Sequence, residues 1–208
     1  MNTELVQKAY DIAKEQYAAI GVDTEAAIAK MKDVNISLHC WQTDDVGGFE
    51  TEDGQLSGGI QATGNYPGKA STIEQMRADL EKVLSLLPGK QRLNLHAIYG
   101  DFQGEKVDRD EIEVKHFQSW IDWCKEQGIG LDFNATCFSH DKAADGYTLS
   151  SKNEENRKFW VEHVKRCRAI SAEIGKQLGT PCIHNTWIPD GSKDTPVDRN
   201  GYRALLKK

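Results

Sequence analysis

Histidines and aromatic residues gather at four places in the sequence, each directly after a short run with the composition of a strand. The four clusters occupy residues 39–41, 96–99, 133–140 and 187–190. A neutral imidazole can hydrogen-bond a hydroxyl group, and an aromatic ring offers a flat apolar face. Because the carboxyl ends of parallel strands meet at one edge of a sheet, the four clusters predict a single binding pocket.

An aspartate pair and a cysteine next to a histidine could in principle take part in catalysis, but we interpret both as structural. Asp44 and Asp45 are adjacent carboxylates. Neighbouring residues of an extended chain point apart, so we expect a solvated loop here rather than a shared metal ion. Cys40 follows His39 directly, and the same alternation sends the thiol and the imidazole to opposite faces. A thiol nucleophile is therefore not favoured.

Composition and charge restrict the class of protein. The 208 residues are 38% hydrophobic and 28% charged, which is typical of one globular domain. A net charge of -6 argues against nucleic acid as a partner, and no run of ~20 apolar residues predicts a membrane span. The N-terminus contains acidic residues, unlike a signal peptide, and the five cysteines are widely spaced. We therefore expect a cytoplasmic protein with reduced thiols.

Hydrophobic periodicity predicts the elements that must position the four clusters. Helices are expected over residues 3–20, 24–31, 73–87, 114–128 and 154–178, and strands over residues 34–40, 92–98, 130–134 and 181–187. Two of the helices are expected to begin at capping boxes, with Ser71 and Ser151 as the caps. Strands and helices alternate with short connections, which predicts parallel strands joined by right-handed crossovers.

The predicted fold is α/β, the first half of a (β/α)8 TIM barrel with about four parallel strands and their helices. A doubly wound sheet usually carries a glycine-rich phosphate turn after its first strand, and no such motif follows any strand here. Eight strand–helix units need roughly 250 residues, so this chain has room for about four. A last helix, capped by Asp198, runs only to Lys208. We therefore interpret residues 1–208 as the N-terminal part of a barrel that is truncated before its later strands.

Five strings of residues, in order along the chain, resemble the L-rhamnose isomerase family. They are HCWQTDDV (39–46), GGIQATGNYPG (58–68), NLHAIY (94–99), LDFN with CFSH (131–140) and WIPDG (187–191). The resemblance implies a barrel about twice this length that interconverts L-rhamnose and L-rhamnulose, an aldose and a ketose, in rhamnose catabolism. It also implies two divalent metal ions, preferably Mn2+ (manganese), that hold the sugar oxygens and assist the proton transfers.

The same resemblance implies that the metal ligands are Glu, Asp and His residues on later strands, beyond Lys208. We therefore assign no catalytic residue and no metal ligand to this chain, and we expect it to be inactive alone. Its expected partners are the sugar and further copies of the protein. The family enzyme implies a homo-oligomer, a tetramer, whereas this chain is expected to dimerise or otherwise self-associate because a half-barrel leaves strand edges unpaired.

Six residues are predicted to bind the sugar on the basis of the resemblance. Trp187 and His96 resemble a pocket tryptophan and a substrate-facing histidine of the family, and Phe133 would cover the sugar or a neighbouring site. An apolar patch around the C6 methyl group of this 6-deoxy sugar would be formed by Val46, Leu56 and Ile98. The alternative for each residue is ordinary packing in the barrel or its loops, and for Ile98 this alternative is favoured.

Two other functions stay open. A xylose-isomerase-like isomerase or epimerase also uses a barrel and two metal ions, although the string at residues 58–68 favours the rhamnose enzyme. A non-catalytic half-barrel that binds sugar or serves assembly would also lack a full set of metal ligands. An assay of L-rhamnose conversion to L-rhamnulose separates an active rhamnose isomerase from a non-catalytic half-barrel.

Overall fold

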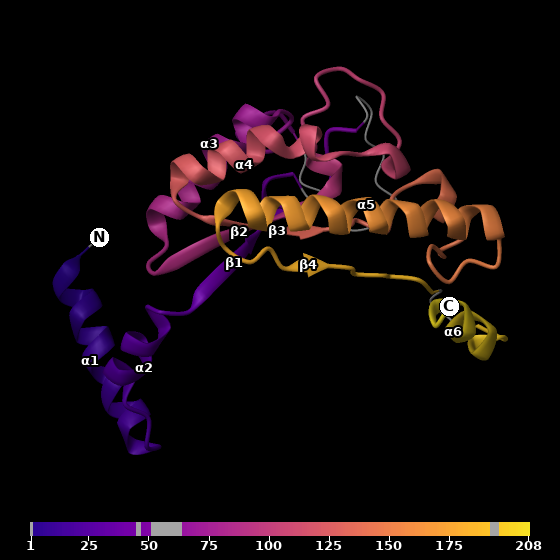
Figure 1. Cartoon of the computed structure of the whole chain (residues 1–208). Coiled ribbons are helices and arrows are strands. Elements are labelled where there is room, and N and C mark those ends of the chain that lie inside the picture. Colours follow the sequence, from indigo (N-terminus) through magenta and orange to yellow (C-terminus); the bar gives the residue numbers. More distant parts are fainter. Residues whose placement is uncertain (1, 45–46, 51–63, 192–195) are drawn as a thin grey trace.

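A sheet of four parallel strands forms the centre of the computed structural model, which describes residues 2–44, 47–50, 64–191 and 196–208. The strands are β1 (Asn35–His39), β2 (Lys90–His96), β3 (Gly130–Asn134) and β4 (His184–Asn185), and each pairs with its neighbour in sequence. Helices α3 (Ile73–Leu86), α4 (Gln118–Gln127) and α5 (Glu154–Leu178) lie over one face of the sheet (Figure 1).

The predicted α/β class, with four parallel strands and alternating helices, is confirmed. The strand order follows the sequence order, which is compatible with the first four units of a (β/α)8 barrel. The limits of two strands differ most from those predicted, because β2 lies two residues earlier in the sequence and β4 is shorter. β2 ends at His96, where a 3-10 turn over Ala97–Tyr99 begins, and β4 pairs over only two residues.

The two faces of the sheet differ in polarity because successive side chains of a strand point to opposite sides. Leu93, Leu95, Leu131 and Phe133 lie on the face under the helices and are buried in the hydrophobic core with Trp120. The opposite face carries polar side chains at Ser37, His39, Arg92, Asn94, His96, Asp132 and Asn134. In a closed barrel this second face would be the interior.

An ion pair on the polar face joins three strands near their amino ends. The guanidinium of Arg92 donates to both oxygens of Asp132, with Nη2–Oδ1 at 2.7 Å and Nε–Oδ2 at 3.0 Å. Ser37 on β1 donates to Oδ2 at 2.7 Å, and the backbone N–H of Ile183 donates to Oδ1 at 2.9 Å. Desolvation works to raise the pKa of Asp132, but these hydrogen bonds outweigh it and lower the pKa.

Two helices begin at residues other than their predicted caps. The cap of α3 is Thr72, whose hydroxyl accepts the backbone N–H of Gln75 at 3.3 Å. The cap of α5 is Asn153, whose side chain accepts two N–H groups of the first turn. The predictions of Ser71 and Ser151 are therefore wrong, because in each case another good capping residue lies within two positions.

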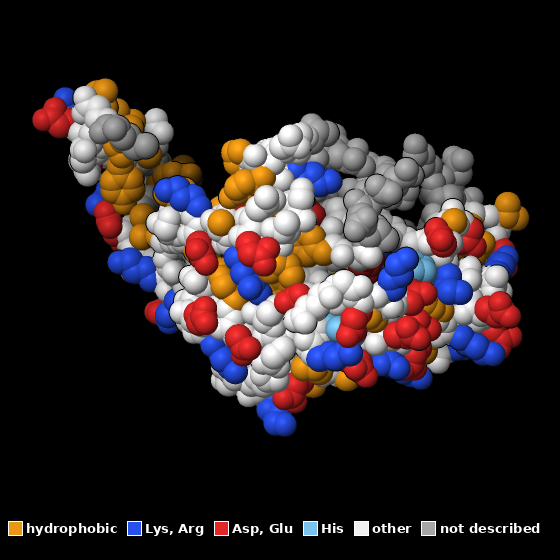
Figure 2. Space-filling model, turned by 90° about the horizontal axis from the view of Figure 1, so that it is seen from above, with side chains coloured by type: hydrophobic (Ala, Val, Ile, Leu, Met, Phe, Trp, Pro, Cys, Tyr) orange, Lys and Arg blue, Asp and Glu red, His pale blue; other side chains and the backbone are white. Residues whose placement is uncertain are grey.

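The N-terminal helices α1 (Thr3–Ala19) and α2 (Thr24–Met31) form a hairpin that projects from the rest of the chain (Figure 1). They contact each other where the hydroxyl of Tyr10 donates to Glu25 at 2.9 Å. None of their residues is buried, and hydrophobic side chains lie exposed on the hairpin (Figure 2). The apolar stripe that predicted α1 is thus only partly covered, with Val6 and Tyr17 at 50% and 51% exposure.

The last helix, α6 (Arg199–Leu206), is held against the loop that precedes α5. Its cap is Asp198, as predicted, which accepts the N–H of Gly201 at 2.9 Å. Tyr202 stacks on Tyr147 with ring centroids 4.1 Å apart. Among the helices that the structure describes, none is long and apolar enough to cross a membrane.

Candidate functional site

The carboxyl ends of the strands bring His96 together with the turn after β3. His96 is the last residue of β2 and is fully buried. Its Nδ1 lies 3.2 Å from the hydroxyl oxygen of Thr136, and its ring centroid lies 6.4 Å from that of His39. The clusters that follow the first three strands therefore lie side by side.

Burial keeps the imidazole of His96 neutral. Desolvation is the main cause that lowers its pKa from 6.5 to about 3, and electrostatic interactions with His39 and Arg109 act in the same direction. A neutral imidazole has one donor and one acceptor nitrogen. His96 is therefore suited to exchange a hydrogen bond with a hydroxyl group of a ligand.

Thr136 holds the ring of His96 from the turn after β3. Its φ is +57°, a left-handed conformation that is unusual for a β-branched residue. Its N–H donates to the side-chain oxygen of Asn134 at 2.8 Å, and its hydroxyl accepts the N–H of Ala97 at 3.1 Å. The ends of β2 and β3 thus fix the hydroxyl that contacts His96.

Phe138 stands between His96 and Trp187, the two side chains for which the resemblance predicts direct sugar contact. Its ring meets the ring of His96 edge to face at 6.1 Å and the ring of Trp187 edge to face at 5.4 Å. Trp187 follows β4 and is 46% exposed, so part of its indole faces solvent. We call these three residues the aromatic wall. Phe138 is not among the residues predicted to bind the sugar, although the string CFSH contains it.

Asp190 fixes the segment that carries Trp187. Its carboxylate accepts the hydroxyl of Thr148 at 2.5 Å, and the N–H and hydroxyl of Ser150 at 2.9 and 2.6 Å. Thr148 and Ser150 are both buried. Because Asp190 lies three residues after Trp187, these bonds join the end of β4 to the loop before α5.

Phe133 lies on the other side of the sheet from His96. It is fully buried on the helix face and meets Phe117 edge to face at 4.8 Å. This position favours the alternative interpretation of Phe133 as a core residue. A phenylalanine contact with the ligand would come from Phe138 instead.

The residues of the predicted apolar patch are described only in part. Ile98 is buried in the 3-10 turn after β2, and its carbonyl accepts the N–H of Phe49 at 2.8 Å. The segment that contains Phe49 therefore packs directly on Ile98. Val46 and Leu56 lie outside the residues that the structure describes.

Asp44 is buried, so the prediction that it belongs to a solvated loop is wrong. It is 1% exposed, and it accepts the hydroxyl of Tyr99 at 2.5 Å and the N–H of Gly48 at 2.9 Å. The chain after β1 turns back over the end of β2, which encloses the carboxylate. Asp45 lies outside the described residues.

The two manganese ions that the resemblance implies have no recognisable cluster of ligands among the described residues. In this part of the chain, no three His, Cys, Asp or Glu side chains are placed to hold a metal ion together. Asp132 and Asp44 are engaged by hydrogen bonds. Burial raises the pKa of the Cys124 and Cys137 thiols to about 12. The ligands expected on later strands stay a prediction.

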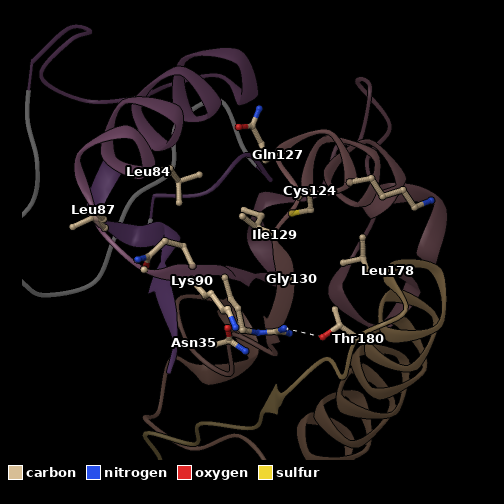
Figure 3. Close-up of a pocket in the computed structure, with 15 residues that line it drawn as sticks. Asn35, Leu84, Leu87, Lys90, Cys124, Gln127, Ile129, Gly130, Leu178 and Thr180 are labelled. Atoms are coloured by element: carbon tan, nitrogen blue, oxygen red, sulfur yellow. Dashed lines mark hydrogen bonds between the residues drawn. The ribbon is translucent and has the colours of Figure 1, made fainter. Parts of the chain in front are cut away.

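A cavity of about 740 Å³ opens at the other end of the sheet (Figure 3). It lies at the amino ends of β2 and β3 and beneath the C-terminal ends of α3, α4 and α5, with Leu84, Ile129 and Leu178 among its walls. No His, Asp or Glu is among its described lining residues. Barrel enzymes bind substrates at the carboxyl ends of the strands, so this cavity is not the candidate site.

Comparison with known proteins identifies the family. The family model of L-rhamnose isomerase (RhaA) matches residues 4–208. Curated proteins named L-rhamnose isomerase from Bacteroides thetaiotaomicron, Listeria monocytogenes and Rhodopirellula baltica are 61%, 60% and 54% identical, over 98%, 97% and 97% of this chain. The matches cover 49%, 48% and 47% of those relatives, so the chain spans about half the length of the curated relatives it matches. Because the family model matches nearly every residue, the chain belongs to the L-rhamnose isomerase family.

Proposed function

We propose that this chain forms one half of the sugar site of an L-rhamnose isomerase, which interconverts L-rhamnose and L-rhamnulose. The observation that carries the proposal is the aromatic wall, which lies at the carboxyl ends of parallel strands, where barrel enzymes hold their substrates. Family membership across residues 4–208 supports L-rhamnose as the sugar.

Each member of the aromatic wall has a proposed part in binding. His96 exchanges a hydrogen bond with a sugar hydroxyl or the ring oxygen, since its imidazole is neutral. Trp187 and Phe138 pack against the C–H face of the pyranose and exclude water from it. The wall binds and orients the sugar.

The apolar patch is proposed to surround the C6 methyl group. Ile98 lies buried beneath the segment at Gly48 and Phe49, which would place it at the base of the patch. Val46 and Leu56 would complete it. A methyl group placed among these side chains is removed from water, which favours a 6-deoxy sugar over its 6-hydroxy analogue.

Two manganese ions belong to the proposed complete site, with ligands on the later strands. Oxygen and imidazole ligands suit this ion. We assign no ligand and no catalytic step to the residues that the structure describes. We expect this chain alone to be inactive for that reason.

We also propose that the chain works in a cytoplasmic assembly. In the described sheet, β1 pairs only with β2, and β4 pairs only with β3. Unpaired strand edges and exposed apolar side chains favour association. The complete enzyme is proposed to be a tetramer, and this chain alone is proposed to self-associate.

The test is an assay of L-rhamnose conversion to L-rhamnulose in excess manganese. This chain is assayed alone, and again after mixing with a segment that corresponds to the second half of its relatives. We expect activity only in the mixture. Activity of this chain alone would show that our placement of the metal ligands is wrong.

A mixture that forms a stable complex but converts no L-rhamnose would contradict the proposed reaction.

The Trp187→Ala variant serves as the internal comparison, because it removes one surface of the wall and leaves the sheet intact. We expect its KM for L-rhamnose to rise by about tenfold, as the loss of one ring contact predicts.

A further inference from the structure

Arg109 uses every donor of its guanidinium to hold two segments together. It lies in the 3-10 turn η3 (Arg109–Glu111) and is 2% exposed. Its Nε donates to the two oxygens of Glu50 at 3.0 and 3.2 Å, and Nη2 donates to one of them at 3.0 Å. Nη2 also donates to the carbonyl of Ser139 at 2.8 Å, and Nη1 donates to the carbonyls of Thr136 and Phe138 at 2.6 and 2.5 Å.

The three carbonyls belong to a turn whose backbone is strained. Thr136 and Ser139 have φ angles of +57° and +51°, which L-residues with side chains rarely adopt. Carbonyl groups that converge on one point repel one another unless a cation or donors occupy that point. The guanidinium of Arg109 occupies it, so the cation stabilises a turn that residue preferences disfavour.

The turn carries two of the groups that contact His96. The hydroxyl of Thr136 lies 3.2 Å from Nδ1, and the ring of Phe138 meets the imidazole edge to face at 6.1 Å. Phe138 also meets Trp187 at 5.4 Å. The position of the whole aromatic wall therefore depends on the shape of residues 136–139.

We propose that Arg109 is a positioning residue for the sugar site, which sets the aromatic wall through the turn at residues 136–139. The effect of this role on sugar binding and turnover rests on the proposed function. The Arg109 guanidinium donates its hydrogen bonds to Glu50 and to backbone carbonyls of the turn. It acts through the three carbonyls that it binds.

Helix α5 holds Arg109 in place from the other side. The ring of Trp160 lies 5.7 Å from the guanidinium carbon. His163, which is fully buried, contacts the carbonyls of Arg109 and Ala135 through its two ring nitrogens. His163 thus supports both the backbone of Arg109 and the residue that precedes the turn.

A lysine at position 109 cannot make the same set of hydrogen bonds. Its ammonium group has three donors at one point, whereas the guanidinium presents five in a planar fork. Arg109→Lys keeps the positive charge beside Glu50 but loses the simultaneous contact with all three carbonyls. The substitution therefore tests geometry rather than charge.

The first measurement is a double-mutant cycle in the enzyme that contains this chain and the second half of the barrel. Arg109→Lys and Phe138→Leu are each expected to raise the KM for L-rhamnose about tenfold with little change in kcat. If Arg109 acts through the wall, the double variant has nearly the same KM as either single variant. Effects that multiply to about a hundredfold would overturn the proposal.

Arg157→Lys is the matched control. Arg157 also donates to a backbone carbonyl, that of Ser151 at 2.6 Å, but in the first turn of α5. We expect its KM to stay at the value of the unmodified enzyme. A rise equal to that of Arg109→Lys would show a general effect of losing an arginine, and would overturn the proposal.

The second measurement needs no sugar. Histidine-selective and indole NMR spectra of this chain are expected to show shifted His96 and Trp187 signals in Arg109→Lys, and unchanged signals in Arg157→Lys. Unshifted signals in folded Arg109→Lys would overturn the proposal. If that variant does not fold, Glu50→Gln, which removes the partner charge at constant shape, carries the same test. If the unmodified enzyme converts no L-rhamnose, the proposed function fails and these spectra still decide the role of Arg109.

Discussion

At the scale of single residues, the neutrality of His96 is the property on which its proposed binding role depends. The pKa of folded His96 is about 3, whereas an unfolded histidine takes up its proton near 6.5. The unfolded state therefore binds more protons between these values, so the free energy of unfolding falls as the pH is lowered through this window. We expect His96→Gln to reduce this slope, measured by urea unfolding at a series of pH values.

The state of His96 itself can be observed by NMR titration. We expect the ring nitrogens of His96 to show no protonation between about pH 5 and pH 8, where an unperturbed histidine titrates. A titration midpoint inside that range would contradict the neutral state. It would also make His96 a candidate for proton transfer rather than for binding alone.

Gly48 marks the closest approach of the chain after β1 to Ile98. Its φ is +74°, and a Cβ at this position would lie 2.8 Å from the Cβ of Ile98. We expect Gly48→Ala to lower the free energy of unfolding by about 2–4 kcal/mol, from backbone strain and overpacking together.

The variant Gly64→Ala separates the effect of backbone strain from the effect of overpacking. Gly64 has a φ of +87°, but a Cβ added there would meet no atom of the described residues within 4 Å, so we expect the substitution to add strain without a clash. We expect a loss of about 1–2 kcal/mol in the same urea experiment. If both variants lost the same free energy of unfolding, the clash with Ile98 would not contribute to the loss.

The difference between Phe133 and Phe138 shows which part of the site the sequence could predict. The string from 131 to 140 correctly indicated that a strand ends here and that aromatic side chains follow it. Strand alternation then places Phe133 on the helix face. The left-handed residue Thr136 interrupts that alternation and turns Phe138 toward His96. Its conformation depends on the contacts of Arg109, which is distant in sequence, so local periodicity could not reveal it.

At the scale of the elements, the ion pair of Arg92 and Asp132 joins the strands of the sheet. Asp132→Asn would leave the buried guanidinium without its counter-charge and weaken the bonds from Ser37 and Ile183. We expect the free energy of unfolding to fall by about 3–5 kcal/mol, as it does when one partner of a buried pair is removed. Urea unfolding followed by circular dichroism measures this change.

Asp33→Asn is the control for charge alone. Asp33 pairs with Lys90 at 3.3 Å, but its side chain is 85% exposed. Its loss should change the free energy of unfolding by well under about 1 kcal/mol, as is usual for an exposed pair. If Asp132→Asn were equally mild, the pair would not be what joins the strands.

The order of helices and strands could be predicted because each element carries its own periodic pattern. α4, α5 and β3 lie where their apolar spacing indicated. The limits of β4 could not be predicted, since pairing over His184–Asn185 depends on the backbone of β3 rather than on local composition. The caps of α3 and α5 lie one and two residues after the predicted ones because several capping residues stand together. The α-helix α4 begins four residues later than predicted, because Val114–Phe117 forms a 3-10 turn.

At the scale of the whole molecule, the described sheet has two open edges. β1 and β4 each have a partner on one side only, and the α1–α2 hairpin buries none of its residues. Such edges and apolar surfaces favour association between copies. The sequence could predict this feature from the count of strands, whereas the projection of α1 and α2 away from the sheet is visible only in the structure (Figure 1).

The open edge at β1 can be tested with one pair of substitutions. Ile36 on β1 and Val161 on α5 are similarly exposed, at 42% and 39%. A lysine on an edge strand opposes pairing with another strand, because the charge would have to be buried in the new interface. We expect sedimentation velocity to show association of the unmodified chain as its concentration rises, weaker association of Ile36→Lys, and no change for Val161→Lys. A chain that stays monomeric at every concentration would contradict the proposed self-association. Equal effects of the two lysines would place the contact away from β1.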